Sequence, residues 1–167
     1  MYVPFEQMPS SSRVWIYQAD RAFSPEEEEI ISLALTRFCS TWAAHGNPLQ
    51  TSFVIAYRQF VILSVDESSA GASGCSIDGS VGVLKELGAR LNIDFFNRSR
   101  IAFLVDGEIR THALSQLSSL FASSHLTASV QTFNNLVTTK SAWEKTWKTT
   151  AKKSWLVKYL PKDALSL

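Results

Sequence analysis

The sequence predicts an α+β protein with a ferredoxin-like βαββαβ core, an extra strand and a helical C-terminal extension. Three observations lead to this prediction. A strongly capped helix begins at Ser24 between β-prone runs, a second helical pattern over 76–91 follows a pair of such runs, and Asp106-Gly107 marks a hairpin turn after the next run. A hairpin flanked by helices also fits a profilin-like or roadblock-like α/β sandwich, and these folds are the alternatives.

The first strand and the first helix have clear local signals. Residues 14–17 are aromatic and branched, as is typical of a strand. Ser24 is placed as N-cap, Pro25 as the first helical residue and Glu27 as the partner in a capping box. An apolar stripe then recurs at helical spacing: Ile31, Leu35, Phe38 and Trp42. Gly46 is the expected end of this helix.

The middle of the chain predicts a hairpin and a second helix. Residues 52–57 and 60–66 are β-prone and are separated by Arg58-Gln59. Because 60–63 is continuously apolar, this strand is expected to be central and covered on both faces. Residues 67–74 are expected to form a loop, and Ser76 to cap the helix that follows.

The remaining elements are a strand at 100–105, a return strand after Asp106-Gly107, a short helix over 114–121 and a strand near 130–133. Residues 140–167 are rich in lysine and tryptophan and predict short helices broken near Thr149-Thr150. Since no linker is evident, the sequence predicts one domain over 1–167.

Composition excludes several classes of protein. The chain has 167 residues, 46% of them apolar and 19% charged, with a formal net charge of +1. This is ordinary globular composition, and the overall charge points to neither nucleic acid nor membrane as partner. The N-terminus has no basic and apolar signal region, no apolar run reaches about 18 residues, and two cysteines make no disulfide framework. A cytoplasmic protein is expected, and the sequence leaves open whether it forms a homo-oligomer.

Several motifs resemble a known family. Pro4-Phe5-Glu6-Gln7-Met8-Pro9, Gly74-Cys75-Ser76-Ile77-Asp78 and Phe133-Asn134-Asn135-Leu136-Val137 are similar to those of a family of small bacterial proteins without an assigned activity, often labelled "ABC transporter ATPase". The resemblance implies no catalytic residues. An ABC ATPase needs a glycine-rich loop that ends in Gly-Lys, and no lysine here follows a glycine. The ATPase label is therefore rejected.

The candidate catalytic residues gather around the loop before the second helix. Cys75 is a nucleophile or redox thiol if the helix start lowers its pKa, and a plain loop cysteine if not. Asp66, Glu67 and Asp78 bracket the same loop and would support acid–base chemistry if they converged there. In the structural interpretation they are solvated acids at the ends of a strand and a helix. No metal motif is present, and no metal or cofactor is expected.

The sequence signals for ligand-binding residues are weaker than those for the candidate catalytic residues. Gly74 and Ser76 would offer backbone N–H groups to an anion. Asn134 and Asn135 carry amides that either face a ligand or hold a turn.

The C-terminal extension is the second region of interest. From residue 140 onward seven lysines stand against Glu144 and Asp163, a net charge of +5. Lysines interleaved with tryptophans are typical of single-stranded nucleic-acid binding. Trp143 and Trp147 are four residues apart and so share a helix face, which favours docking onto the protein instead.

Three hypotheses follow. The leading one is a non-enzymatic binding or interaction module, because no catalytic constellation stands out. The second is a thiol-dependent enzyme that uses Cys75. The third is a protein that binds single-stranded nucleic acid through the extension.

Overall fold

The structure is a computed structural model that describes residues 1–44, 46–68 and 74–166, with backbone alone for 44, 74–76, 165 and 166. Its contacts divide the chain into two compact units, and the single domain over 1–167 stays a prediction. Unit 1 comprises Met1–Asn97 and Leu136–Glu144, and unit 2 comprises Arg98–Asn135 and Lys145–Leu167. Both contain helices and antiparallel sheets, which confirms the α+β class.

Unit 1 is built on a three-stranded antiparallel sheet in the order β1-β5-β4. Its elements are η1 (Phe5–Gln7), β1 (Arg13–Gln18), α1 (Pro25–Thr41), β2 (Ala43–Ala44), β3 (Asn47–Pro48), β4 (Gln50–Ala56), β5 (Phe60–Asp66) and α2 (Gly74–Leu91). A further helix, α4 (Lys140–Thr146), begins in unit 1 and ends in unit 2. Since β1 and β4 are both antiparallel to β5, they are parallel to each other, and α1 connects them as in a split βαβ motif.

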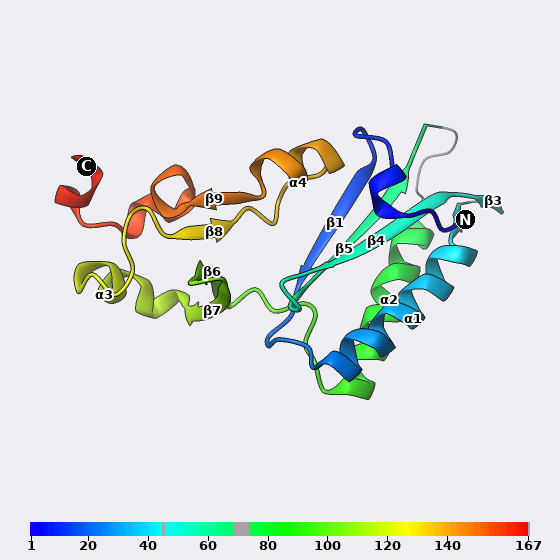
Figure 1. The fold of residues 1–167 in the computed structure, drawn as a ribbon, viewed down its shortest axis with the longest axis horizontal. Coiled ribbons are helices and arrows are strands. Elements are labelled where there is room, and N and C mark those ends of the chain that lie inside the picture. Colours follow the sequence, from blue (N-terminus) through cyan, green and yellow to red (C-terminus); the bar gives the residue numbers. More distant parts are fainter. Residues whose placement is uncertain (45, 69–73, 167) are drawn as a thin grey trace. The chain divides into compact units, whose positions relative to one another are not determined.

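The central strand β5 is buried along its whole length, which confirms the prediction from its apolar run. Alternate side chains of a strand point to opposite faces. Val61, Leu63 and Val65 belong to the core that also contains the buried residues of α1 and α2. Both helices therefore cover the same face of this sheet (Figure 1).

The strand that was expected to complete a four-stranded ferredoxin-like sheet is not part of the unit 1 sheet. β6 (Arg100–Val105) pairs with β7 (Glu108–Ala113) and β8 (Gln131–Phe133) in unit 2, not with β1. The edge of β1 that does not pair with β5 instead forms backbone hydrogen bonds with residues 138–140. Val14 N–H donates to the Thr138 carbonyl at 2.9 Å, and Lys140 N–H donates to the Ser12 carbonyl at 2.8 Å. These pairings join residues far apart in sequence, so local propensity gives no sign of them.

Helix α1 begins as predicted. Ser24 Oγ accepts the Glu27 N–H at 3.1 Å, and Glu27 Oε1 accepts the Ser24 N–H at 2.9 Å, which completes the capping box. The same carboxylate pairs with Arg21 at 2.7 Å, and these contacts lower the pKa of Glu27 to about 2. The helix ends at Thr41, before Gly46, because Trp42 has an extended backbone and is buried in the core.

Unit 2 has a four-stranded antiparallel sheet in the order β7-β6-β8-β9. Its remaining elements are η2 (Leu114–Gln116), α3 (Leu117–Ala122), β9 (Lys148–Thr150), η3 (Ala151–Lys153), η4 (Trp155–Tyr159) and η5 (Lys162–Ser166). The β6–β7 hairpin turns at Asp106 and Gly107, whose φ angles of 53° and 79° lie in the left-handed region, as predicted from this pair.

The C-terminal extension over 140–167 has short helices on both sides of Thr149-Thr150, as predicted, since α4 ends at Thr146 and η3 begins at Ala151. The break between them is a strand that the sequence did not predict: Thr149 and Thr150 belong to β9, which pairs with β8. β-Branched threonines favour a strand where a partner is available, and β8 supplies one. Short 3₁₀ helices follow, and Leu156 and Leu160 anchor them to a core that also contains Phe103, Leu117 and Phe121.

Candidate functional site

The stretch from Asp66 to Asp78 is described in part, since residues 69–73 lie outside the described residues. Helix α2 begins at Gly74, so Gly74, Cys75 and Ser76 form its first turn and not a preceding loop. The prediction of Ser76 as N-cap is therefore wrong. Glycine costs a helix only about 1 kcal/mol, which added backbone hydrogen bonds offset. Asp78 lies beyond the first turn and is exposed.

Asp66, the last residue of β5, and Glu67, which follows it, both have structural contacts. Asp66 Oδ1 accepts the Ser68 N–H at 2.9 Å, and strand alternation places Asp66 on the sheet face opposite to α2. Glu67 Oε1 lies 3.7 Å from Arg13 Nη1. Among the described residues, no three His, Cys, Asp or Glu side chains lie close enough together to hold a metal ion. Convergence of Asp66, Glu67 and Asp78 with Cys75 stays a prediction.

The described part of unit 1 contains no histidine that could act as the base for Cys75. His45 lies outside the described residues, and His112 and His125 belong to unit 2. Burial and, to a smaller extent, the nearby charges of Arg100 and Arg110 lower the pKa of His112, which favours the neutral form of its ring. Cys39 is fully buried, and burial raises the pKa of its thiol to about 11. This thiol is structural. The Cys75 side chain lies outside the described part.

The two candidate asparagines contact Trp147. Asn135 Oδ1 accepts the Trp147 Nε1–H at 2.9 Å, and the Asn134 N–H donates to the Trp147 carbonyl at 2.7 Å. Trp147 is 3% exposed and packs against the ring of Phe133. These contacts fix a turn and a core tryptophan, which favours the structural interpretation; a ligand role for the asparagines stays a prediction.

The C-terminal tryptophans and lysines have different roles. Trp143 packs edge-on against Phe5 with ring centroids 5.3 Å apart, and Trp147 is buried. Lys140, which is 5% exposed, donates from Nζ to the carbonyls of Met8 at 2.7 Å and Glu6 at 3.2 Å. Lys140 is therefore a structural residue and does not belong to the basic surface that the sequence predicts.

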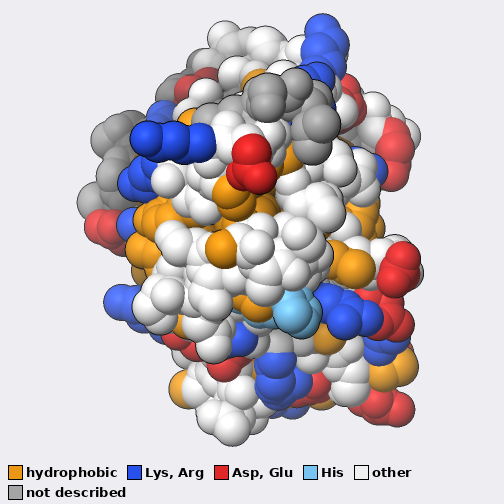
Figure 2. All heavy atoms as spheres, turned by 90° about the vertical axis from the view of Figure 1, so that its left-hand side faces the viewer, with side chains coloured by type: hydrophobic (Ala, Val, Ile, Leu, Met, Phe, Trp, Pro, Cys, Tyr) orange, Lys and Arg blue, Asp and Glu red, His pale blue; other side chains and the backbone are white. Residues whose placement is uncertain are grey.

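Trp155, by contrast, is 50% exposed at the start of η4. The Lys158 ammonium lies 5.6 Å from its ring centroid and 5.3 Å from that of Tyr159. Other exposed lysines precede and follow it in the chain. We call this the Trp155 surface; it consists of Lys152, Lys153, Trp155, Lys158 and Lys162. Exposed Lys and Arg side chains are spread over the face of the molecule that Figure 2 shows.

The division into units uncovers a charge asymmetry that the overall charge of +1 conceals. Unit 2 contains nine lysines and arginines but three acids, a net charge of +6. Unit 1 contains seven basic and twelve acidic residues, a net charge of −5. The basic residues gather in the unit that carries Trp155. A charge asymmetry between two parts of one chain suggests interaction with a nucleic acid or a membrane, or marks a basic or acidic tail.

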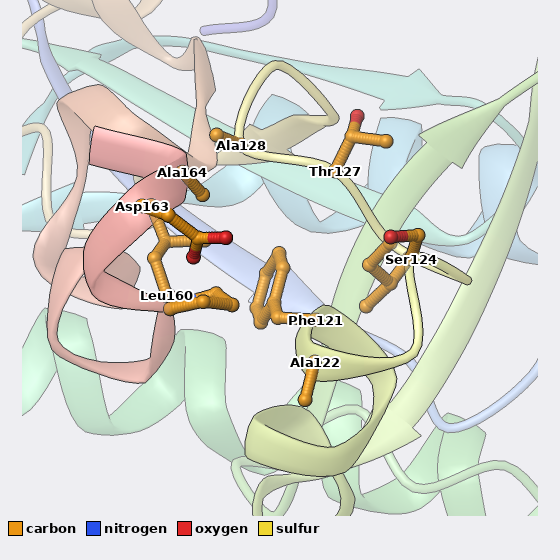
Figure 3. A pocket seen from close by; sticks show the side chains of 10 residues that line it. Phe121, Ala122, Ser124, Thr127, Ala128, Leu160, Asp163 and Ala164 are labelled. Carbon is orange, nitrogen blue, oxygen red and sulfur yellow. The ribbon is translucent and has the colours of Figure 1, made fainter. Parts of the chain in front are cut away.

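Unit 2 also contains a pocket of about 330 Å³. Phe121, Leu126 and Leu160 supply apolar walls, and the Asp163 carboxylate points into the hollow above Leu160 and Phe121 (Figure 3). The remaining lining residues are Ala122, Ser124, Thr127, Ala128, Pro161 and Ala164. Sequence reasoning missed this pocket, because its apolar residues have the spacing of core residues and its two walls lie more than 30 residues apart in the chain.

Local contacts hold these walls. Ser124 has a φ of 62°, and its N–H donates to the Phe121 carbonyl at 3.2 Å, which turns the chain sharply after α3. The Lys152 N–H donates to the Ala128 carbonyl at 2.9 Å and ties one wall to η3. On the opposite wall, the Ala164 N–H donates to the Pro161 carbonyl at 3.1 Å. The pocket is therefore shaped by backbone hydrogen bonds within unit 2.

No described helix is both long and apolar enough to cross a membrane. No family model, curated protein or solved structure matches this chain, so the family resemblance stays an expectation.

Proposed function

We propose that this chain is a non-enzymatic binding module and that its partner is a single-stranded nucleic acid, which contacts the Trp155 surface of unit 2. The observation that carries the proposal is the half-exposed Trp155 ring among exposed lysines in a unit of net charge +6. Large aromatic side chains are usually buried, as Trp42 and Trp147 are here. An exposed ring beside lysines offers a stacking platform next to phosphate-binding charges.

A membrane surface is the competing partner for lysine and tryptophan, and the local structure disfavours it. Binding at a membrane interface needs an extended amphipathic helix with a broad apolar face. Here η3 and η4 are 3₁₀ helices of three and five residues, and the large apolar side chains exposed in η4 are Trp155 and Val157. Two such residues suit stacking on a few bases better than insertion into lipid.

The proposal agrees with the other sequence expectations. A cytoplasmic location gives access to nucleic acid, and a free, buried Cys39 fits a reducing compartment. Thiol chemistry at Cys75 is the separate second hypothesis, and the pH dependence of Cys75 alkylation tests it. An apparent pKa near the ordinary value of about 8.5 would argue against an activated thiolate.

Fluorescence anisotropy with a labelled 12-nucleotide single strand of mixed sequence tests the proposal. Losing one stacked base costs about 1–3 kcal/mol, so Trp155→Ala should weaken binding roughly 5- to 150-fold. Lys158→Gln should weaken binding and reduce the slope of log affinity against log salt by about 0.7. The matched control is Lys85→Gln, which removes an exposed lysine from α2 of unit 1 and should leave both quantities unchanged.

Three results would contradict the proposal. They are no binding at 50 mM salt, equal affinity for the wild type and Trp155→Ala, or the same salt slope for Lys158→Gln as for the wild type. Vesicles containing anionic lipid provide the comparison. Binding to vesicles that exceeds binding to the oligonucleotide and depends on Trp155 would assign the surface to a membrane instead.

A further inference from the structure

We infer that the Trp155 surface holds its strand at an unstacked step between two bases, and that it therefore prefers strands rich in thymine or uracil to strands rich in adenine. This inference rests on the proposed function and deepens it by naming the class of strand that is bound. It follows from the angle between the rings of Trp155 and Tyr159 and from the lysine that lies beside both.

The rings of Trp155 and Tyr159 are almost perpendicular. Their centroids are 6.0 Å apart, and the ring planes are inclined by 84°. Neighbouring bases of a stacked strand lie roughly parallel to each other, so they cannot stack on two perpendicular rings at once. A strand that contacts both rings must therefore turn one base away from the next.

The packing of η4 maintains this angle. Leu156 and Leu160, at 0% and 8% exposed, anchor the segment in the core of unit 2, and the partly buried Tyr159 packs against the same core. Trp155 faces solvent beside it. The edge-to-face contact that the two rings make is also one that aromatic pairs prefer over a face-to-face sandwich. The strand therefore has to adapt to the rings.

Lys158 places a phosphate at the corner between the rings. Its ammonium lies 5.6 Å from the ring centroid of Trp155 and 5.3 Å from that of Tyr159. A phosphate that binds this ammonium joins two nucleotides, and each of the two has a different ring beside it. The step that this phosphate joins is therefore the unstacked one.

The cost of separating two bases depends on which bases they are. Base stacking varies several-fold in strength from step to step, and two large purine rings overlap more than two pyrimidine rings do. Proteins that bind single strands without reading base edges owe their sequence preferences to this stacking strength and to backbone flexibility. Thymine and uracil stack weakly on their neighbours, so strands of these bases lose least when they follow the corner.

The experiment compares three labelled 12-nucleotide strands by fluorescence anisotropy at 50 mM salt. The wild type should bind oligothymidine about 3- to 40-fold more tightly than oligodeoxyadenosine, the factor that the stacking of one step implies. In the third strand, adenines alternate with abasic sites, so each adenine can stack on a ring without leaving a neighbouring base. This strand should also bind more tightly than oligodeoxyadenosine, although it has half as many bases.

Variants of Tyr159 test whether the second ring causes the preference. Tyr159→Leu removes the ring and keeps an apolar side chain against the core. It should reduce the preference for thymine to less than about twofold, because the strand then contacts one ring and its bases can remain stacked. Tyr159→Phe keeps the ring and should keep the preference. The matched control is Tyr2→Leu, the same change at a tyrosine of unit 1 that is 36% exposed, which should leave all three affinities unchanged.

The outcomes separate this inference from the proposed function. Equal binding of the thymine and adenine strands, a preference for adenine, an abasic strand that binds no better than oligodeoxyadenosine, or a preference that survives in Tyr159→Leu would each overturn the inference. The proposed function would still stand if Trp155→Ala weakened binding. If no strand binds, both fail. Thermal unfolding checks that each variant is folded, and should Tyr159→Leu not fold, the abasic strand still decides on the wild type.

Discussion

Replacing Gly88 in α2 by alanine tests the packing of unit 1 directly. A Cβ atom added at Gly88 would lie closer to the Ile93 carbonyl oxygen than non-bonded atoms tolerate, and 3.6 Å from Phe95 Cδ2. Ile93 and Phe95 are 5% and 1% exposed, so neither is free to move outward. The Ile93 N–H also donates to the Gly88 carbonyl at 3.0 Å and holds the turn that ends the helix.

The expected size of the effect follows from opposing terms. Replacing glycine by alanine inside a helix gains about 1 kcal/mol. Overpacking a buried site costs about 1–3 kcal/mol, and a weakened hydrogen bond costs about 1 kcal/mol more. Gly88→Ala should therefore lower the free energy of unfolding by about 1–3 kcal/mol. Gly82 lies in the same helix with nothing within 4 Å of an added Cβ, so Gly82→Ala should raise it by about 1 kcal/mol.

Urea unfolding followed by tryptophan fluorescence measures both variants, with Trp15 and Trp42 as reporters in unit 1. The midpoints should move in opposite directions with little change in slope. In thermal unfolding the two variants should differ by roughly 5–15 °C. If Gly88→Ala were as stable as Gly82→Ala, the close approach of Gly88 to Ile93 would be refuted.

Two further predictions concern buried groups in unit 1. Burial raises the pKa of Cys39 to about 11 from 9.0, so the unfolded chain loses this proton first as pH rises. Stability should fall between pH 9 and 11 by on the order of 2 kcal/mol, and Cys39→Ala should remove that part of the fall; parallel pH curves for the two proteins would exclude the effect. Lys140→Met should lower the free energy of unfolding by about 2–4 kcal/mol, because the carbonyls of Met8 and Glu6 lose their ammonium donor. Exposed Lys145→Met should change it by less than about 0.5 kcal/mol, and equal urea midpoints for the two lysine variants would contradict the role of Lys140.

The candidate site was predictable only in part. The lysines and tryptophans of the extension are visible in the composition. Which of them reach solvent is not. Lys140 and Trp147 stand in the same lysine- and tryptophan-rich stretch as Lys158 and Trp155, yet the first pair is buried and the second is exposed or half-exposed. Burial depends on which strands and helices pack over a residue, and a local pattern does not contain that information.

The sequence by itself determined the elements whose signals are local. The capping box at Ser24, the apolar run of β5 and the Asp106-Gly107 turn each act within a few residues, so their physics is present in the chain order. Only the tertiary structure decided where β6 pairs, which segment covers the edge of β1, and that Phe121 and Asp163 meet at one pocket. These contacts join residues 27 to 128 positions apart. They depend on the burial and pairing of whole elements, which no short stretch of sequence specifies.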